Sequence, residues 1–315
     1  MPSETGTEVW LESTVTEPKT FFHEACIKAI KGTSPFQFVF VPWFWNGAYR
    51  APDTDMHGAV RGGARDQDEA DLAARFGLDA GQLAWRRVKI SEIGPDAFRH
   101  EYPASPEDAL AVDHPATAMD RRLIGAAVNR PKAQEGHAAA APVWGLDPGR
   151  FVDDRPRLAK RLGDALLEPV AVLALSPPNR QATIAAVVTA FADTPDRLRP
   201  RRIFVASIGS DNEVAAALRL AGLPAIDVAP GASARGDGRF VRQRDALWWA
   251  ARDWFAGRRC RIPDDTGLIL DLSAPLRRVT PEGQMEIEAA DETRTRVGYG
   301  PDLAEAFVLT FADGV

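Results

Sequence analysis

The spacing of hydrophobic and polar positions changes about halfway along the chain. In the first half an almost unbroken apolar run at 36–45 is rich in aromatic and β-branched residues, and it predicts a buried strand. A polar, glycine-rich stretch at 53–65 predicts a loop. Helical spacing follows at 66–76, where Gly77 provides a stop, and again at 79–90. This half is therefore predicted to combine helices with one buried strand.

From residue 142 onward, short apolar runs alternate with helical patterns. Strands are predicted at 142–147, 157–161, 166–174, 202–207 and 224–228. Helices are predicted at 179–192, 212–221, 239–256 and 301–312. Alternation of this kind favours an α/β fold in which helices flank a sheet. The residues before it, 105–141, weaken into proline, alanine and charge, and we expect them to form a linker region.

Composition makes this an ordinary globular protein. The chain has 315 residues, of which 45% are hydrophobic and 26% charged, and this length is typical of about two domains. The net charge of −6 argues against a protein that coats DNA through a basic surface, so any DNA contact must come from local patches. Arginine-rich segments at 155–161, 197–202 and 242–261 are candidates, although each is also typical of a solvated face.

The cysteine and histidine content predicts no disulfide framework and no zinc site. Cys26 and Cys260 are the two cysteines, which fits a reducing cytoplasm. The five histidines lack zinc-ligand spacing. No N-terminal signal pattern is present, and no apolar run approaches the roughly 20 residues of a membrane helix. We therefore expect a soluble, cytoplasmic protein without a membrane partner.

Two common catalytic motifs are missing from the sequence. A Walker A loop requires Gly-x-x-x-x-Gly-Lys followed by Ser or Thr, and no such string occurs, which excludes an autonomous P-loop ATPase. No Gly-x-Ser-x-Gly elbow occurs either, and this argues against a serine hydrolase of that type.

The carboxylates carry more chemical information. The predicted strand at 142–147 ends at Asp147, a Pro-Gly turn follows, and Asp153 and Asp154 come next. Asp302 and Glu305 lie three residues apart near the start of the last predicted helix, and this spacing places them on one helix face. Hard cations such as Mg²⁺ prefer oxygen ligands, so these carboxylates are candidate ligands for metal-assisted phosphodiester chemistry. The alternative is that Asp302 complements the helix dipole and Glu305 is merely solvated.

Several short segments, taken in order, resemble the large terminase subunit of tailed phages and prophages. The matching segments are Glu12-Ser13-Thr14, Phe21-Phe22-His23-Glu24, residues 40–45, Tyr49-Arg50, residues 83–87, residues 98–109, residues 147–154, Arg244 with Trp248, residues 262–265 and residues 301–312. Each segment alone is a weak signal, but together they cover almost the whole chain.

The resemblance implies both a fold and an activity. Residues 142–315 would form an RNase H-like nuclease domain with a mixed sheet, residues 1–104 a remnant of the terminase ATPase domain, and residues 105–141 the linker. The implied activity is two-metal hydrolysis of double-stranded DNA during packaging, with Mg²⁺ or Mn²⁺ as cofactor. The implied partners besides DNA are a separate ATPase chain, the small terminase subunit or the portal.

The resemblance also implies roles for the carboxylates. Asp147 would bridge the two metal ions, Asp153 or Asp154 would support one of them, and Asp302 or Glu305 would complete the site. All five are predicted metal ligands, and all except Asp153 are predicted catalytic residues.

Three departures from the family pattern weaken the implied activity. The family's strand corresponding to 202–207 ordinarily ends in an acidic ligand, and the aligned residue here is Ala206, whose methyl group binds no metal. Asp211 or Asp227 would have to substitute for it. The family usually has aspartate where this chain has Glu305, and the P-loop part of the ATPase domain is missing.

Three hypotheses follow from these observations. The first is a truncated large terminase with a weakened endonuclease. The second is an inactive terminase relic that binds only DNA or a partner. The third is an unrelated α/β binding protein, which would be favoured if Asp147 and Asp302 lay far apart.

Overall fold

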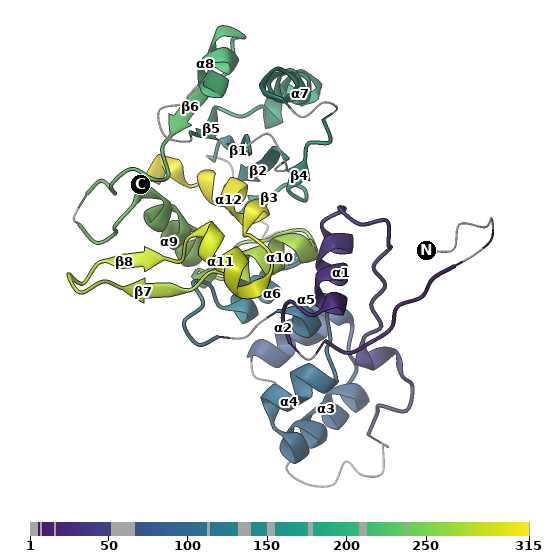
Figure 1. Cartoon of the computed structure of the whole chain (residues 1–315). Helices are drawn as coiled ribbons and strands as arrows, with labels where there is room; N and C mark the ends of the chain where they lie inside the picture. The colour runs from purple at the N-terminus through teal and green to yellow at the C-terminus, as the bar shows by residue number, and fades with distance from the viewer. Residues whose placement is uncertain are drawn as a thin grey trace. The chain divides into compact units, whose positions relative to one another are not determined.

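A computed structural model of the chain divides into two compact units (Figure 1). The helical unit comprises 1–64, 78–112 and 297–299, and the sheet unit comprises 65–77, 113–296 and 300–315. The structure describes residues 6, 8–15, 17–51, 67–111, 114–131, 140–149, 155–175, 179–207, 213–236 and 238–314. The domain boundaries drawn from sequence at 104 and 141 stay a prediction.

The helical unit is held together by an aromatic cluster. Its helices are α1 (Phe21–Ile30), α3 (Ala80–Ile93), α4 (Pro95–Glu101) and α5 (Pro106–Leu110), with a short 3₁₀ helix η1 at Trp43–Trp45. Trp43 stacks on Trp85 with ring centroids 5.2 Å apart, and Tyr49 stacks on the same indole at 4.5 Å. Stacked aromatic pairs add stability beyond the area that they bury. The cluster therefore ties the segment before α3 to α3 itself.

The strand predicted at 36–45 is wrong. Residues 36–41 are extended but belong to no sheet, and residues 43–45 form η1. Val39 and Val41 are 65% and 68% exposed, while Phe36, Phe38 and Phe40 of the same run are half-buried. An apolar run becomes a buried strand only when other strands pair with it, and the described part of the helical unit contains no strand.

The sheet unit is built on a mixed sheet in the order β3-β2-β1-β5-β6, with β4 pairing to β2. The strands are β1 (Pro142–Asp147), β2 (Arg157–Leu162), β3 (Ala165–Leu166), β4 (Ala171–Val172), β5 (Arg202–Ala206) and β6 (Ala225–Val228). The β1–β2 pair is antiparallel, whereas the β1–β5 and β5–β6 pairs are parallel. The predicted α/β class with a mixed sheet flanked by helices is confirmed.

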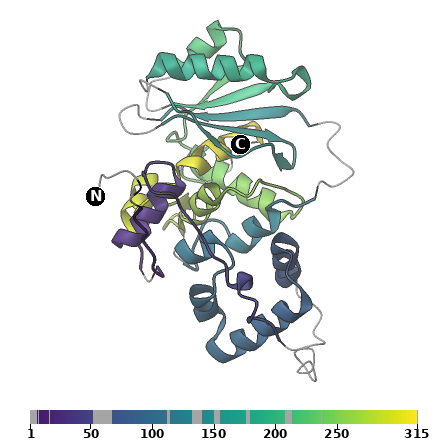
Figure 2. The same ribbon diagram turned by 90° about the vertical axis from the view of Figure 1, so that its right-hand side faces the viewer.

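Each face of the sheet is covered by its own helices. Helices α7 (Arg180–Asp193) and α8 (Glu213–Leu220) cover one face, and α12 (Asp302–Leu309) and α9 (Gln243–Ala256) lie on the other side (Figure 2). Side chains alternate between the faces along a strand, so Trp144 and Leu146 pack in the α7–α8 core. Val143 and Phe204 pack in the α12 core.

Three contacts, two with the sheet and one with a neighbouring helix, fix the position of α12. A Cβ atom on Gly145 would lie 2.1 Å from the carbonyl oxygen of Ala306, so the helix packs directly on the β1 backbone. At the C-terminal end, Arg161 of β2 donates from Nη2 to the carbonyl of Thr310 at 2.6 Å, and burial lowers the pKa of Arg161 to about 10. At the N-terminal end, the amide of Leu303 donates to the buried carboxylate of Asp271 at 2.7 Å. These contacts hold the first turn of α12 in a defined place.

Several elements of the sheet unit were not predicted from sequence. They are α6 (Arg121–Ala127), α10 (Thr266–Ser273), the hairpin of β7 (Arg277–Val279) and β8 (Met285–Ile287), and α11 (Ala290–Val297). Helix α2 (Gln67–Phe76), which contacts α6, was predicted. Every residue from Gly267 to Ser273 in α10 is buried, so the helix shows no alternation of apolar and polar faces. The hairpin strands are too short to give a period.

A buried glutamate at the end of β8 makes stability depend on pH. Burial alone would raise the pKa of Glu288, but hydrogen bonds from Arg296, the Leu276 amide and Thr293 outweigh it and lower that pKa. The stabilisation is therefore present above the ordinary glutamate pKa and is lost as pH falls through the lowered folded value.

We expect Glu288→Gln to lower the free energy of unfolding by about 2 kcal/mol at neutral pH, and by much less near pH 3. Urea unfolding at both pH values measures the difference. Glu92→Gln, which changes an exposed glutamate, is the control. An equal loss at both pH values for Glu288→Gln would contradict the assignment.

Candidate functional site

One row of residues crosses the sheet where β1 ends. Asp147 of β1 lies directly opposite Arg157 of β2 in the antiparallel ladder. On the other side Leu146 pairs with Val205, so Asp147 and Ala206 are each one residue further along neighbouring parallel strands. The row therefore places the predicted metal-bridging carboxylate between an arginine and the alanine at the expected ligand position.

This row faces α12. Gly145 packs against α12, and Asp147 lies two residues further along the strand, so it points to the same face. Ala206 packs against the core on the α12 side as well. The strand ends in a turn, in which Oδ1 of Asp147 accepts a hydrogen bond from the Gly149 amide at 3.1 Å. Gly149 has φ 67, a left-handed conformation that favours glycine.

Asp302, the first residue of α12, is held between two guanidinium groups. Its Oδ2 lies 3.3 Å from Nη2 of Arg157, and its Oδ1 accepts from Nη2 of Arg294 at 3.0 Å. A Cβ atom on Gly300 would lie 2.4 Å from Arg294 Nη2 and 2.6 Å from Asp302 Oδ1, so glycine leaves room for this pair. The side chains of Asp302 and Arg157 are 20% and 11% exposed. Each carboxylate oxygen of Asp302 is therefore occupied by an arginine.

Glu305 is bound by a third arginine. Nε and Nη2 of Arg244 donate to Oε1 of Glu305 at 2.9 and 2.6 Å. Nη1 of Arg244 donates to the carbonyls of Ile287 and Glu288, and its guanidinium lies 5.4 Å from the ring centroid of Trp248. Arg244 is thus fixed on every side, and Glu305 is fixed with it.

The structure brings together part of the predicted site. Asp147 lies opposite Arg157 in the strand ladder, and the side chain of Arg157 forms an ion pair with Asp302. Asp153, Asp154 and Asp211 lie outside the described residues.

Asp227 does not replace the missing ligand at Ala206. It pairs with Val205, whose side chain lies in the α7–α8 core, so Asp227 belongs to the face opposite Asp147. The suggestion that Asp227 joins the Asp147 site is wrong, because a one-residue offset along β6 reverses the face.

The described residues do not fit a site for two divalent ions. Within the described ranges, no group of three or more His, Cys, Asp or Glu side chains is placed to hold a metal. Asp302 and Glu305 are bound to arginines, and Ala206 offers a methyl group. Positive charge beside a carboxylate disfavours a second cation there.

The sequence patterns did not reveal the three arginines that bind Asp302 and Glu305, and these arginines are the reason why the described residues do not fit a two-metal site. Arg157 and Arg244 lay within segments noted as basic patches, and Arg244 was otherwise named only, with Trp248, among the segments that resemble the family. Arg294 had no local signal at all. Their roles depend on the strand register and on the packing of α9 and α11 near α12, which local patterns do not encode.

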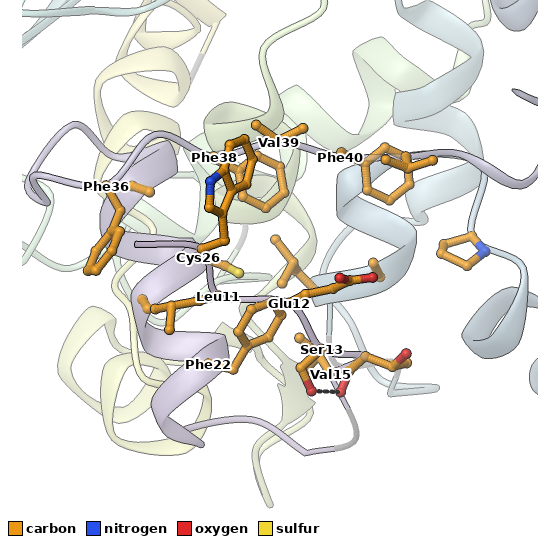
Figure 3. Close-up of a pocket in the computed structure, with 18 of the residues that line it drawn as sticks. Leu11, Glu12, Ser13, Val15, Phe22, Cys26, Phe36, Phe38, Val39 and Phe40 are labelled. Carbon is orange, nitrogen blue, oxygen red and sulfur yellow. Dashed lines mark hydrogen bonds between the residues drawn. The ribbon is translucent and has the colours of Figure 1, made fainter. Parts of the chain in front are cut away.

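A cavity of about 380 Å³ lies in the helical unit (Figure 3). It is lined mainly by apolar side chains of three segments: residues 9–15, α1 and residues 36–41. Cys26 of α1 points into it, and burial raises the pKa of that thiol. None of the predicted ligand residues lines this cavity.

In the part of the chain that the structure describes, no helix is long and apolar enough to cross a membrane. No protein-family model matches the sequence, and no curated protein matches it either.

Solved structures do match. The nuclease domain of the large terminase subunit of bacterial virus Sf6, in a structure with manganese and β-thujaplicinol, gives a TM-score of 0.51 at 16% identity. That match covers 62% of this chain and 97% of the Sf6 domain. The large terminase nuclease of thermophilic phage G20c with bound magnesium gives a TM-score of 0.44 at 12% identity, covering 64% and 98% of the two chains. The likeness to the Sf6 domain agrees with the sheet order and helix layers described above. The chain thus has the RNase H-like fold of a large-terminase nuclease domain.

Proposed function

We propose that this chain is a large-terminase-type protein that binds double-stranded DNA and has lost two-metal hydrolysis. The observation that carries the proposal is the corner formed by Asp147, Arg157 and Asp302 on a terminase nuclease fold. It is the place that the resemblance assigns to DNA cleavage, and an arginine lies within it. A separate ATPase chain, a small terminase subunit or a portal would be partners of the same assembly.

Loss of hydrolysis follows from the occupants of the corner. Two-metal catalysis needs several carboxylates to hold two ions about 4 Å apart. Here Asp302 and Glu305 are bound by three arginines, and Ala206 supplies no ligand. Releasing either carboxylate would break ion pairs that are largely shielded from water.

A cationic and aromatic cluster on α9 and in the residues before it supports DNA contact. The guanidinium of Arg239 lies 5.1 Å from the ring centroid of Phe240 and 5.2 Å from that of Trp249. Arg252 stacks on Trp249 at 4.6 Å. Guanidinium groups beside aromatic rings are a common way of recognising phosphate and nucleic acid. Trp249 and Arg252 lie within the arginine-rich segment noted at 242–261, and Arg239 and Phe240 come just before it.

DNA binding is tested by fluorescence anisotropy with a labelled duplex in EDTA. We expect salt-dependent binding by the wild type, and the salt slope should fall by about 1 for each of Arg239→Ala and Arg252→Ala. Arg122→Ala is the control, because Arg122 is an exposed arginine outside the cluster that pairs with Asp120. Absence of duplex binding by the folded wild type would overturn the proposed function.

A metal-dependent endonuclease is the second candidate. It is favoured by Asp147, a carboxylate at a strand end with Asp153 and Asp154 close behind it in the sequence. Mg²⁺ or Mn²⁺ would then be held by Asp147 and that acidic pair. This candidate predicts DNA cleavage that requires a divalent ion and Asp147, whereas the first predicts binding without cleavage.

A further inference from the structure

The corner beside α12 contains a positive charge supplied by the fold itself. Arg157 projects from β2, and its backbone is held on both sides, opposite Asp147 of β1 and opposite Val172 of β4. Its side chain is 11% exposed. A guanidinium anchored by strand pairing keeps its position, unlike one on a surface loop.

The contacts of Asp302 match those expected of a carboxylate with a resident counter-cation. Arg157 lies 3.3 Å from one oxygen and Arg294 lies 3.0 Å from the other. The second carboxylate on the same helix face, Glu305, has Arg244 at 2.6 Å. The carboxylates of α12 therefore have their charge balanced without any metal ion.

We propose that the guanidinium of Arg157 occupies the position of a divalent cation between the end of β1 at Asp147 and the start of α12 at Asp302. It thereby excludes divalent ions from this position. The inference rests on the proposed function, since it explains why a terminase-type site would bind DNA without hydrolysing it. Arg157 is a positioning residue that holds Asp302, and its removal would take away the positive charge that lies opposite Asp147 in the strand ladder and pairs with Asp302.

The proposal makes a specific statement about metal binding. A divalent ion approaching Asp302 meets the positive charge of Arg157, and to bind it must displace a largely buried ion pair. Removing Arg157 takes away its share of the repulsion and frees one oxygen of Asp302, while Arg294 still binds the other. The carboxylates at this end of the sheet then have one positive charge fewer beside them, which favours uptake of a cation.

Mn²⁺ binding is measured on the full chain by the electron paramagnetic resonance signal of free Mn²⁺. We expect the wild type to show no specific site in the millimolar range and Arg157→Ala to bind at least about tenfold more tightly. Arg157→Lys keeps the charge and should behave as the wild type. Arg75→Ala, which removes an arginine paired with Asp264 elsewhere in the sheet unit, should also leave Mn²⁺ binding unchanged.

A double variant assigns the new site. Adding Asp302→Asn to Arg157→Ala should abolish the gained Mn²⁺ binding. A wild-type site that Asp302→Asn removes would overturn the proposal, and this titration needs no arginine variant to fold. Equal Mn²⁺ binding by wild type and a folded Arg157→Ala protein would overturn it too.

The anisotropy measurement in EDTA separates this proposal from the proposed function. If the wild type binds no duplex but the Mn²⁺ titrations give the expected results, the proposed DNA binding is refuted and the role of Arg157 stands. Duplex binding together with a tight wild-type Mn²⁺ site would refute only the role of Arg157.

Discussion

Replacing Gly145 with alanine is expected to lower the free energy of unfolding by about 3 kcal/mol, the upper end for an overpacked core. The added Cβ atom would lie 2.1 Å from the carbonyl oxygen of Ala306, and 3.1 Å from the Cβ atom of Leu309. The first of these atoms belongs to the helix backbone, so no rotamer change relieves the clash. Helix α12 must move away from β1, which also displaces Asp302 and Glu305.

Urea unfolding of wild type and Gly145→Ala measures this effect. Gly231→Ala is the matched control, because a Cβ atom at Gly231 would meet nothing within 4 Å. Equal stability of Gly145→Ala and Gly231→Ala would show that α12 does not rest on the β1 backbone as described.

The second large effect is expected at Phe307, the main aromatic anchor of α12. Phe307 is completely buried, and its ring lies 5.3 Å from that of Phe311 and 5.7 Å from that of Trp254. Truncation to alanine should lower the free energy of unfolding by about 4 kcal/mol, because the protein loses the contacts of the ring and keeps a cavity in its place.

Thermal and urea unfolding would show the loss, with Phe21→Ala as control because Phe21 is 74% exposed. Phe307→Leu should cost less, since more of the volume is kept. If Phe307→Ala and Phe21→Ala destabilised the protein equally, the proposed packing of α12 would be incorrect.

Local patterns predicted the framework of the sheet unit well. The strand at 142–147 is a short apolar run with a clear end, and the helices near 180–193 and 213–220 are recognisable from their composition. Asn179, for example, caps α7 by accepting a hydrogen bond from the Ala182 amide. Such signals lie within a few residues of each other, so the sequence displays them directly.

Pairing between distant segments was beyond the reach of such patterns. The apolar run at 36–45 has the composition of a buried strand but finds no partner in the described helical unit. Helix α10 is buried on all sides and therefore lacks a polar face to mark it.

The candidate site shows the same division. The end of β1 at Asp147 and the shared face of Asp302 and Glu305 follow from local spacing. Their pairing with arginines from β2, α9 and α11 follows from register and tertiary packing. The sequence thus located the carboxylates but not the charges that neutralise them.

Cleavage of supercoiled plasmid DNA with Mn²⁺ tests the central claim most directly. The account predicts that wild type and Asp147→Ala leave the plasmid equally intact, although the wild type binds the same DNA in EDTA. Conversion to nicked or linear plasmid by the wild type, abolished by Asp147→Ala and by Asp302→Asn, would contradict it and establish a working endonuclease.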